Sequence, residues 1–280
     1  MIRLPTLQDF SEATEDSVLK LWEGLGYYRR VKNFHKAAKQ VVRDFGGNVP
    51  ENKEDLLNLP GIGDYTAAAI SSIAYRKKEF VVDGNVQRFF SRLFDWEIDI
   101  KERRSFNFFV EQGRSMLDYS DPRLLNQAVM EIGSTLCLPK TPHCNHCPVQ
   151  KNCLSKVNRT ISLRPVKQKR ESLTQLDVSF YLVKKKDRFL LQKQRDWWQG
   201  MWLFPWQKNL PVESYKELSS FSFFVTKFKL NARVFGLNES EYKIEMDKEY
   251  SWFSVAELKK TTLPSPGKKI LQWLHRKDHE

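Results

Sequence analysis

The sequence predicts a multidomain protein that is helical in its first half and α+β in its second half. Apolar residues recur at helical spacing up to about residue 155, and short runs rich in Val, Phe and Tyr follow after about residue 174. Between them lies a basic, polar segment interrupted by Pro165, and we interpret residues 156–173 as a linker. A chain of 280 residues is long enough for two packed domains.

The individual elements follow from the same patterns. Residues 29–45 carry one apolar stripe and end at Gly46-Gly47, which favours a capped helix. Further helices are predicted over residues 53–57, 65–74, 86–94, 104–117 and 122–136. In the second half we expect strands over residues 177–185, 188–192, 223–225 and 233–237, and a final helix over residues 267–275.

The net charge is +12, with an isoelectric point near 9.4, and it is unevenly distributed. Residues 1–155 hold 21 Lys and Arg against 20 Asp and Glu, whereas residues 156–280 hold 25 against 14. A basic surface favours a polyanionic partner such as nucleic acid, although it is also compatible with a generally basic soluble surface. Because residues 1–16 contain no apolar run and no stretch approaches the roughly 20 apolar residues of a membrane span, we expect an intracellular protein without membrane association.

All four cysteines lie within one short stretch, at Cys137, Cys144, Cys147 and Cys153. Four thiolates this close together can hold a [4Fe–4S] cluster or a tetrahedral zinc ion. Zinc modules usually contain two closely spaced cysteine pairs, and here only the middle two cysteines are that close, so the spacing favours the cluster. Scattered core cysteines or disulfides are the remaining alternative, and nothing else in the sequence is typical of a secreted protein.

Two short segments of the helical half suggest contact with DNA and catalysis. Leu59-Pro60-Gly61-Ile62-Gly63 separates two helical patterns, and the following helix N-terminus offers free N–H groups to a phosphate. The alternative is an ordinary helix–turn–helix corner. Further along, Asp83 follows Val81-Val82 and precedes Gly84 where a helix begins, which by itself is most simply an N-cap.

Taken together, these features resemble the helix–hairpin–helix DNA glycosylases, and most closely the MutY-type adenine DNA glycosylases. The segment from Leu21 to Tyr28 is similar to the LWxGLGYY sequence of that family, and Asn33 to Ala38 also fits. Val82-Asp83-Gly84-Asn85-Val86 resembles the segment of the catalytic aspartate, and Asn126-Gln127-Ala128 precedes the cysteines as it does in the family. The resemblance covers residues 1–155 and implies an all-helical helix–hairpin–helix glycosylase core with a [4Fe–4S] loop.

The resemblance also implies roles for single residues. Asp83 would stay ionised and stabilise an oxocarbenium-like sugar, and Tyr65 would lie beside the flipped adenine. Tyr27 would insert its ring into the base stack, although core packing is the alternative for Tyr27 and Tyr28. DNA contacts would come from Leu59, Pro60, Gly61, Ile62, Gly63 and Asn85. Endonuclease III-type enzymes have a lysine where this chain has Tyr65, so we expect a monofunctional glycosylase without Schiff-base chemistry.

One expected residue of the family has no counterpart in the sequence. The general acid is a glutamate followed by a QQT stretch, and the match of Met1–Thr6 to an internal part of the family pattern would put that helix upstream of Met1. A misassigned start, a decayed or truncated homologue, or a substitute acid would each explain this. Glu12, Glu15 and Glu23 are nearest in sequence, but each is more simply a solvated helix residue. Loss of the acid would lower the rate by about 10²- to 10⁴-fold.

Residues 174–280 resemble the Nudix-like α/β domain that follows the glycosylase core in this family. Trp198–Pro205 is similar to its W-x-G-L-W-x-F-P stretch, but no metal-binding Nudix box follows, so we expect neither pyrophosphatase activity nor a magnesium site. The family recognises 8-oxoguanine with a serine in this domain, and Thr226 is the best corresponding residue. The alternative is that Thr226 is a strand residue without a special role.

The leading hypothesis is therefore an adenine DNA glycosylase of base-excision repair. It would hydrolyse the bond to adenine in double-stranded DNA, where adenine is mispaired with 8-oxoguanine or guanine, and would be a monomer in the bacterial cytoplasm at the nucleoid. The first alternative is a mispair-binding homologue that does not cut, because the general-acid glutamate is absent. A zinc-dependent DNA-binding module is the second alternative.

Overall fold

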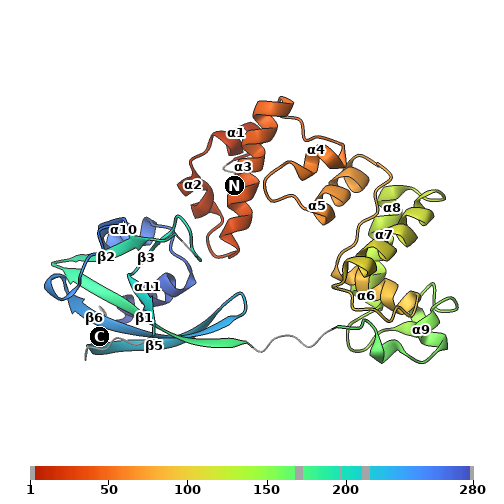
Figure 1. The fold of residues 1–280 in the computed structure, drawn as a ribbon. Coiled ribbons are helices and arrows are strands. Elements are labelled where there is room, and N and C mark those ends of the chain that lie inside the picture. Colours follow the sequence, from red (N-terminus) through yellow and green to blue (C-terminus); the bar gives the residue numbers. More distant parts are fainter. Residues whose placement is uncertain (1–3, 168–172, 196, 210–214, 278–280) are drawn as a thin grey trace. The chain divides into compact units, whose positions relative to one another are not determined.

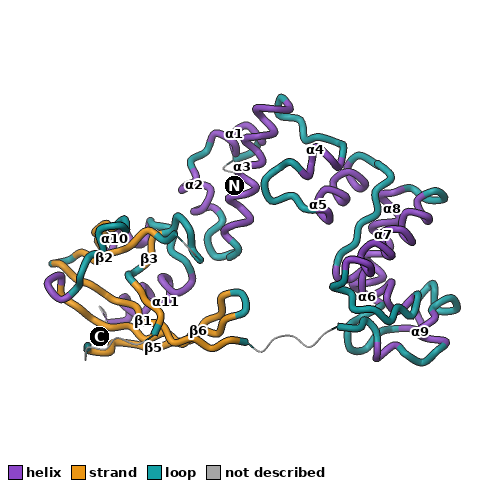
Figure 2. The backbone as a smooth tube through the Cα atoms, viewed as in Figure 1, coloured by secondary structure: helices purple, strands orange, loops and turns teal. Residues whose placement is uncertain are grey.

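The computed structural model describes residues 4–167, 173–195, 197–209 and 215–277. Half of the Met1–Thr6 segment, and residues 168–172 of the predicted linker, therefore lie outside the described residues. Among the described residues every strand lies after residue 173, and helices dominate before it (Figure 2). This confirms the predicted class, a helical region followed by an α+β region.

The chain divides into two compact units whose bounds differ from the predicted domains. Met1–Ser11 and Lys36–Arg170 form the first unit, and Glu12–His35 and Glu171–Glu280 form the second. The second unit therefore contains α2 (Glu15–Leu21) as well as the first part of α3 (Tyr28–Phe45). Sequence patterning did not predict this division, because an apolar stripe does not indicate which partner it packs against.

The helices predicted for the first half of the chain all occur in the predicted order, and α1 (Leu7–Glu12), α2 and α9 (Leu154–Val157) occur in addition to them (Figure 1). In the first unit, after α1 and the second part of α3, come the helices α4 (Lys53–Leu57), α5 (Asp64–Ala69), α6 (Gly84–Leu93), α7 (Arg103–Leu117), α8 (Pro122–Glu131) and α9. The end of α3 is capped as expected: Gly46 and Gly47 have positive φ, and the Gly47 amide donates to the Val41 carbonyl at 3.1 Å.

Two predicted helices end differently from the expectation. The helix predicted over residues 65–74 is α-helical only to Ala69 and continues as the π-helical turn η1 (Ile70–Ala74). The one predicted over residues 122–136 likewise changes from α8 to the π-helical turn η2 (Ile132–Leu136), directly before Cys137. Apolar spacing cannot distinguish these hydrogen-bonding patterns, since a wider turn shifts the stripe by only one residue.

An aromatic core holds the first unit together. Phe90 of α6 is fully buried, and its ring lies within about 6 Å of the rings of Phe80 and Phe109. A second cluster joins α3 to the α4–α5 hairpin through Val41, Leu56 and Leu59. These two clusters fix the hairpin and the start of α6, which carry most of the predicted site residues of this unit.

Residues after Cys153 also belong to the first unit rather than to a free linker. Side chains of Ser155, Asn158 and Thr160 donate hydrogen bonds to the Asp95 carboxylate at 2.6–3.1 Å. Arg164, almost fully buried, completes this network with an ion pair to Asp95 at 2.8 Å. Burial alone would raise the pKa of Asp95, but these donors and the arginine outweigh it and lower the pKa. These contacts bind residues 155–164 to the first unit.

The second unit contains a mixed sheet with the strand order β3-β2-β1-β6-β5 (Figure 1). Its strands are β1 (Thr174–Lys185), β2 (Arg188–Lys193), β3 (Trp202–Leu203), β4 (Trp206–Lys208), β5 (Lys216–Val225), β6 (Phe228–Asn238) and β7 (Tyr250–Ser254). β1 and β6 run parallel along their whole length, from Thr174 opposite Phe228 to Lys184 opposite Asn238. The other pairs are antiparallel, and β4 and β7 add to β1 and β2.

Both faces of this sheet are covered. One face packs against α10 (Val255–Lys260) and α11 (Ser265–Lys277) through Leu258 and Ile270. The other face holds a separate cluster that includes Tyr181 and Phe235. Burial on both faces explains why β1 is apolar without alternation.

Within the described residues, none of the helices combines the length and the apolar character that crossing a bilayer requires.

Candidate active site and metal centre

The α4–α5 hairpin presents its turn to solvent while its flanks are anchored in the core. Leu59 is buried, the Ile62 amide donates to the Leu59 carbonyl at 3.1 Å, and Gly61 has a φ of 81°. Gly63 is the N-cap of α5, and a Cβ added there would meet nothing within 4 Å. The backbone N–H groups beyond Gly63 are thus open to a close-fitting anion such as a phosphate.

Asp83 is held at the N-cap of α6, which is the structural role that the sequence alone suggested for it. One carboxylate oxygen accepts the Val86 amide at 2.7 Å, and the other accepts the Asn85 side-chain amide at 3.2 Å. A carboxylate has about four acceptor sites, so capping leaves part of its capacity for a ligand. A cap and a catalytic role are therefore compatible at this position.

Asn126 of α8 fixes the segment that leads into Asp83. Its side chain is 1% exposed, accepts the Val81 amide at 2.9 Å, and donates to the carbonyls of Glu79 and Pro122 at 2.8 and 2.9 Å. Sequence reasoning noted Asn126 only through the family resemblance. Its position on the apolar face of a predicted helix could have indicated a structural role, because a buried polar side chain needs hydrogen-bond partners.

A continuous set of hydrogen bonds links Asp83 to the cysteine segment. Asn85, which donates to Asp83, accepts a bond at 3.1 Å from the Arg88 guanidinium. Arg88 also donates to the Cys137 carbonyl at 2.7 Å and to the Gly133 carbonyl. Gly133 is required here because a Cβ would lie 2.9 Å from Asn85. The carboxylate and the first cysteine are therefore positioned by the same side chains.

Arg92, one turn further along α6, holds the backbone after Cys137. Its guanidinium donates to the carbonyls of Leu138 and Pro139 at 2.7 and 3.0 Å and to the Arg164 carbonyl at 3.1 Å. It also approaches the Cys137 sulfur at 3.5 Å. Sequence reasoning missed both arginines. Arg88 and Arg92 share the buried face of an apolar helix, and a buried charged side chain needs a hydrogen-bonding or ionic partner, so their positions were the available signal.

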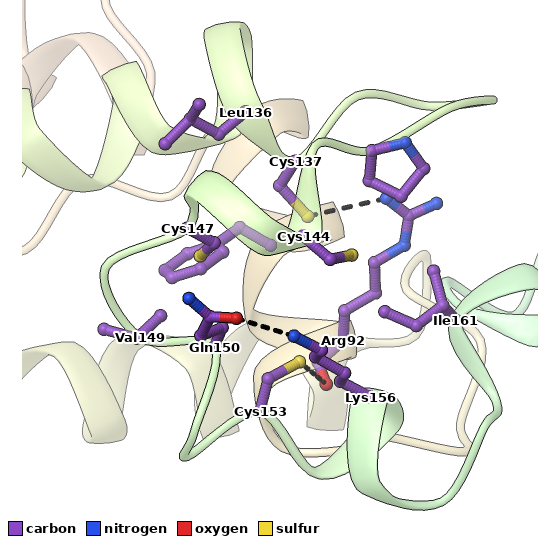
Figure 3. Close-up of a pocket in the computed structure, with 12 residues that line it drawn as sticks. Arg92, Leu136, Cys137, Cys144, Cys147, Val149, Gln150, Cys153, Lys156 and Ile161 are labelled. Carbon is purple, nitrogen blue, oxygen red and sulfur yellow. Dashed lines mark hydrogen bonds between the residues drawn. The ribbon is translucent and has the colours of Figure 1, made fainter.

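The four cysteines line one pocket, with Arg92, Val149 and Ile161 among the other lining residues (Figure 3). Within the part of the chain that the structure describes, no three His, Cys, Asp or Glu side chains converge closely enough to hold a single metal ion. The Cys153 thiol donates to the Arg92 carbonyl at 3.3 Å, and burial raises the pKa of that thiol. Four sulfurs around one mostly apolar pocket are the donor set that an iron–sulfur cluster needs.

The remaining predicted site residues lie in different units. Tyr65, the second residue of α5, is in the first unit with Asp83, and its side chain is 47% exposed. Tyr27 and Thr226 are in the second unit. Tyr27 is 74% exposed, so it does not pack in a core, whereas Tyr28 is partly buried. Thr226 is exposed at the turn between β5 and β6, where its φ is 51°.

Glu15 and Glu23, two of the acids considered as substitutes for the family's general-acid glutamate, are bound to lysines. Glu15 pairs with Lys32 at 2.6 Å. Glu23 lies 2.7 Å from Lys20 and 3.4 Å from Lys268. Partial burial would raise the pKa of Glu23, but the two lysines outweigh it and lower the pKa. These acids, like the exposed Glu12, belong to the second unit.

Comparison with known proteins gives matches to DNA repair proteins. Residues 1–111 match the model of the HhH-GPD superfamily base excision DNA repair proteins. An adenine DNA glycosylase from Rattus norvegicus is 43% identical over 154 residues, which cover 55% of this chain but only 30% of that protein. An adenine DNA glycosylase from Buchnera aphidicola subsp. Schizaphis graminum is 27% identical over 290 residues, covering 96% of this chain and 83% of that protein.

A solved structure of a thermostable thymine-DNA glycosylase is also similar, with a TM-score of 0.49 and 26% identity over 55% of this chain and 70% of that chain. The family match and the relatives concur with the motifs singled out from the sequence. The chain is thus similar over residues 1–111 to the HhH-GPD superfamily of base excision DNA repair proteins, and the two relatives named above are adenine DNA glycosylases.

Proposed function

We propose that the chain is a monofunctional adenine DNA glycosylase of base-excision repair. The observation that carries this proposal is the Asp83 carboxylate, held at the start of α6 by Val86 and Asn85 in the unit that carries the exposed helix–hairpin–helix turn. The similarity to named adenine DNA glycosylases along nearly the whole chain supports the choice of adenine. The substrate is double-stranded DNA with adenine opposite 8-oxoguanine or guanine.

The chemistry assigned to Asp83 is electrostatic. Hydrolysis breaks the bond between the sugar C1′ and adenine, adds the hydroxyl of a water molecule to C1′, and transfers the water proton to the departing base. Positive charge develops on the sugar as that bond breaks, and an ionised carboxylate stabilises it. Because Asp83 already accepts two hydrogen bonds in the folded chain, its carboxylate needs no reorientation when the sugar arrives.

Tyr65 supports monofunctional chemistry. A glycosylase that also cuts the strand needs an amine to attack the sugar, and a tyrosine side chain cannot form a Schiff base. Its half-exposed ring on α5 is suited to stacking beside an extruded adenine. The product is therefore an intact strand with an abasic site.

The hairpin turn supplies contacts to the DNA backbone without reading bases. Leu59 anchors the turn, Pro60 and Gly61 shape it, and Ile62 and Gly63 present their backbone toward a phosphate. Asn85 adds a side chain next to the catalytic carboxylate. In the second unit, Thr226 at the β5–β6 turn is proposed to contact 8-oxoguanine, and its positive φ, strained for a β-branched residue, is a feature often found at functional sites.

Cys137, Cys144, Cys147 and Cys153 are proposed to hold one [4Fe–4S] cluster. The cluster would cross-link the loop and fix its shape, so that Lys140, His143 and Lys151 lie where they can contact phosphates. Arg88 and Arg92 hold the backbone on either side of Cys137. We assign the domains as a glycosylase domain over residues 1–155, a linker over residues 156–173 whose first part is bound to the glycosylase domain through Asp95, and a Nudix-like domain from residue 174. The chain would act as a monomer on DNA inside the cell.

A substrate panel tests the proposal. Purified full-length chain is incubated with duplexes that carry adenine opposite 8-oxoguanine, guanine or thymine, and alkali then reveals abasic sites. We expect excision from the first two duplexes, none from the third, and no product trapped by borohydride. Binding of the mispaired duplexes without excision would contradict the proposal and support the mispair-binding homologue instead. A borohydride-trapped adduct would contradict the monofunctional assignment.

A further inference from the structure

The loop before α3 holds one exposed aromatic ring in a strained backbone. Gly24, Gly26 and Tyr27 all have positive φ, at 94°, 71° and 48°. Glycine adopts this conformation freely, but tyrosine does so only when its surroundings impose it. The Trp22 indole donates to the Gly26 carbonyl at 2.8 Å, and the Arg30 amide donates to the Tyr27 carbonyl at 2.7 Å. These hydrogen bonds stabilise the loop conformation in which the Tyr27 ring is exposed to solvent.

Arg30 covers one face of that ring. Its guanidinium carbon lies 4.6 Å from the centroid of the Tyr27 ring, which is a stacking distance for a planar cation. With one face occupied, the 74% exposed side chain keeps its other face for a second planar group. A nucleobase is the planar group that a DNA-binding protein meets, and bases stack on aromatic rings without sequence preference.

The charges around this loop leave Arg30 available to DNA. The nearby lysines Lys20 and Lys32 are already paired with Glu23 and Glu15, at 2.7 and 2.6 Å. Among the described residues, Arg30 makes no ion pair, and neither does its exposed neighbour Arg29. A guanidinium that stacks with its plane still has N–H donors at its edge, and these suit a phosphate oxygen.

We propose that Arg30 is a positioning residue for the Tyr27 ring, which it holds by stacking on one face while its edge binds a DNA phosphate. The proposal rests on the proposed function, because it needs DNA as the partner. The ring of Tyr27 then enters the base stack at a fixed angle, with the base on its free face. Charge alone is not sufficient for this role, since a lysine ammonium has no plane with which to stack.

The test compares Arg30→Gln and Arg30→Lys with the matched control Arg29→Gln, which removes an exposed arginine from the same helix turn without touching the ring. Each full-length variant is titrated with a duplex that carries adenine opposite 8-oxoguanine and 2-aminopurine beside the mispair. Fluorescence of the 2-aminopurine reports how far the stack is opened, and the dependence of affinity on salt counts phosphate contacts. Circular dichroism and thermal unfolding verify that each variant is folded.

Arg30→Gln should reduce the salt slope by about one, because it removes the proposed phosphate contact, and Arg29→Gln should reduce the slope by no more than that, because it also removes a single positive charge. Only the Arg30 variants, including Arg30→Lys, should lower the 2-aminopurine signal, by about two- to fivefold. In a Tyr27→Ala background the signal should be absent already, and adding Arg30→Gln should change only the salt slope. This non-additivity identifies an effect that acts through the ring.

An Arg30→Gln protein with the same fluorescence signal as Arg29→Gln would overturn the inference, and so would full retention of the signal in Arg30→Lys. Failure of the proposed function has a different signature. In that case the unmodified chain itself would neither bind the mispaired duplex selectively nor raise the 2-aminopurine fluorescence.

Discussion

Replacing Asn126 by alanine tests how the first unit positions Asp83, the proposed catalytic residue. The change removes one bond accepted from Val81 and two bonds donated to Glu79 and Pro122. Each neutral hydrogen bond contributes about 1 kcal/mol net, and leaving the buried Val81 amide without a partner adds to the loss. We expect Asn126→Ala to lower the free energy of unfolding by about 3 kcal/mol.

The assay should resolve where the stability is lost. Hydrogen exchange of the segment around Val81 reports local opening. If that local opening requires less free energy than global unfolding, a loss of about 3 kcal/mol corresponds to roughly a hundredfold faster exchange. Urea unfolding of the same full-length protein gives the global value. Gln127→Ala is the matched control, because Gln127 is the exposed neighbour on α8. It should change stability by less than about 0.5 kcal/mol.

The loss of local stability should also lower the excision rate, because Val81 lies two residues before Asp83. The excision rate of Asn126→Ala should fall further than the folded fraction does, since a loosened segment misplaces the carboxylate. Asn126→Ala behaving like Gln127→Ala in hydrogen exchange, unfolding and excision would refute the reasoning. That outcome would mean that Asn126 does not fix this segment.

Three further predictions follow from the same contacts. Asp95→Asn should destabilise the first unit by about 2 kcal/mol at pH 7, because it removes the buried carboxylate partner of Arg164 and leaves that guanidinium only its ion pair with the exposed Glu97. The lowered pKa of Asp95 implies that its carboxylate stabilises the folded state above about pH 4, and that this stabilisation is lost as the pH falls through the folded-state pKa. The free energies of unfolding of the variant and the unmodified protein, measured in urea, should therefore become equal in acid. Gly63→Ala should leave thermal unfolding nearly unchanged, since a Cβ there meets nothing in the protein, but should weaken DNA binding in a fluorescence titration. Cys147→Ser should lower the iron content and the absorbance near 400 nm of purified protein, whereas a zinc-only site would show neither signal in the unmodified chain.

The sequence was sufficient for the elements whose apolar residues repeat strongly. α3 was predicted within one residue at its start, and its end at Phe45 was marked by the following glycines. α7 and the central strands β1 and β2 were predicted for the same reason. In each case burial of one face, or of both faces, dictates the residue types along the element.

Patterning failed where long-range contacts decide the structure. β3, β4 and β7 were not predicted, because two to five residues are too few for a period to be recognised. The assignment of residues 12–35 to the second unit depends on ion pairs such as Lys268 with Glu23, whose partners are 245 positions apart in the sequence. No local propensity encodes such a contact.

The candidate site divides in the same way. Asp83 and the cysteines became candidates from the sequence alone, because their spacing and order resemble a family. The side chains that hold them were not, because Arg88 and Arg92 are charged residues on an apolar helix and their partners are backbone carbonyls. Backbone partners have no sequence signature, so they can be found only once the fold is known.

The most direct test of the central claim is single-turnover excision of adenine opposite 8-oxoguanine by the full-length chain and by Asp83→Asn. Asparagine caps helices as well as aspartate does, so the variant keeps the bond from Val86 and the start of α6 while it loses the charge. Excision by the unmodified chain, with at least a hundredfold lower rate and unchanged DNA affinity in Asp83→Asn, is the predicted result. Equal rates for the two proteins would contradict the account, because the Asp83 carboxylate would then not stabilise the transition state.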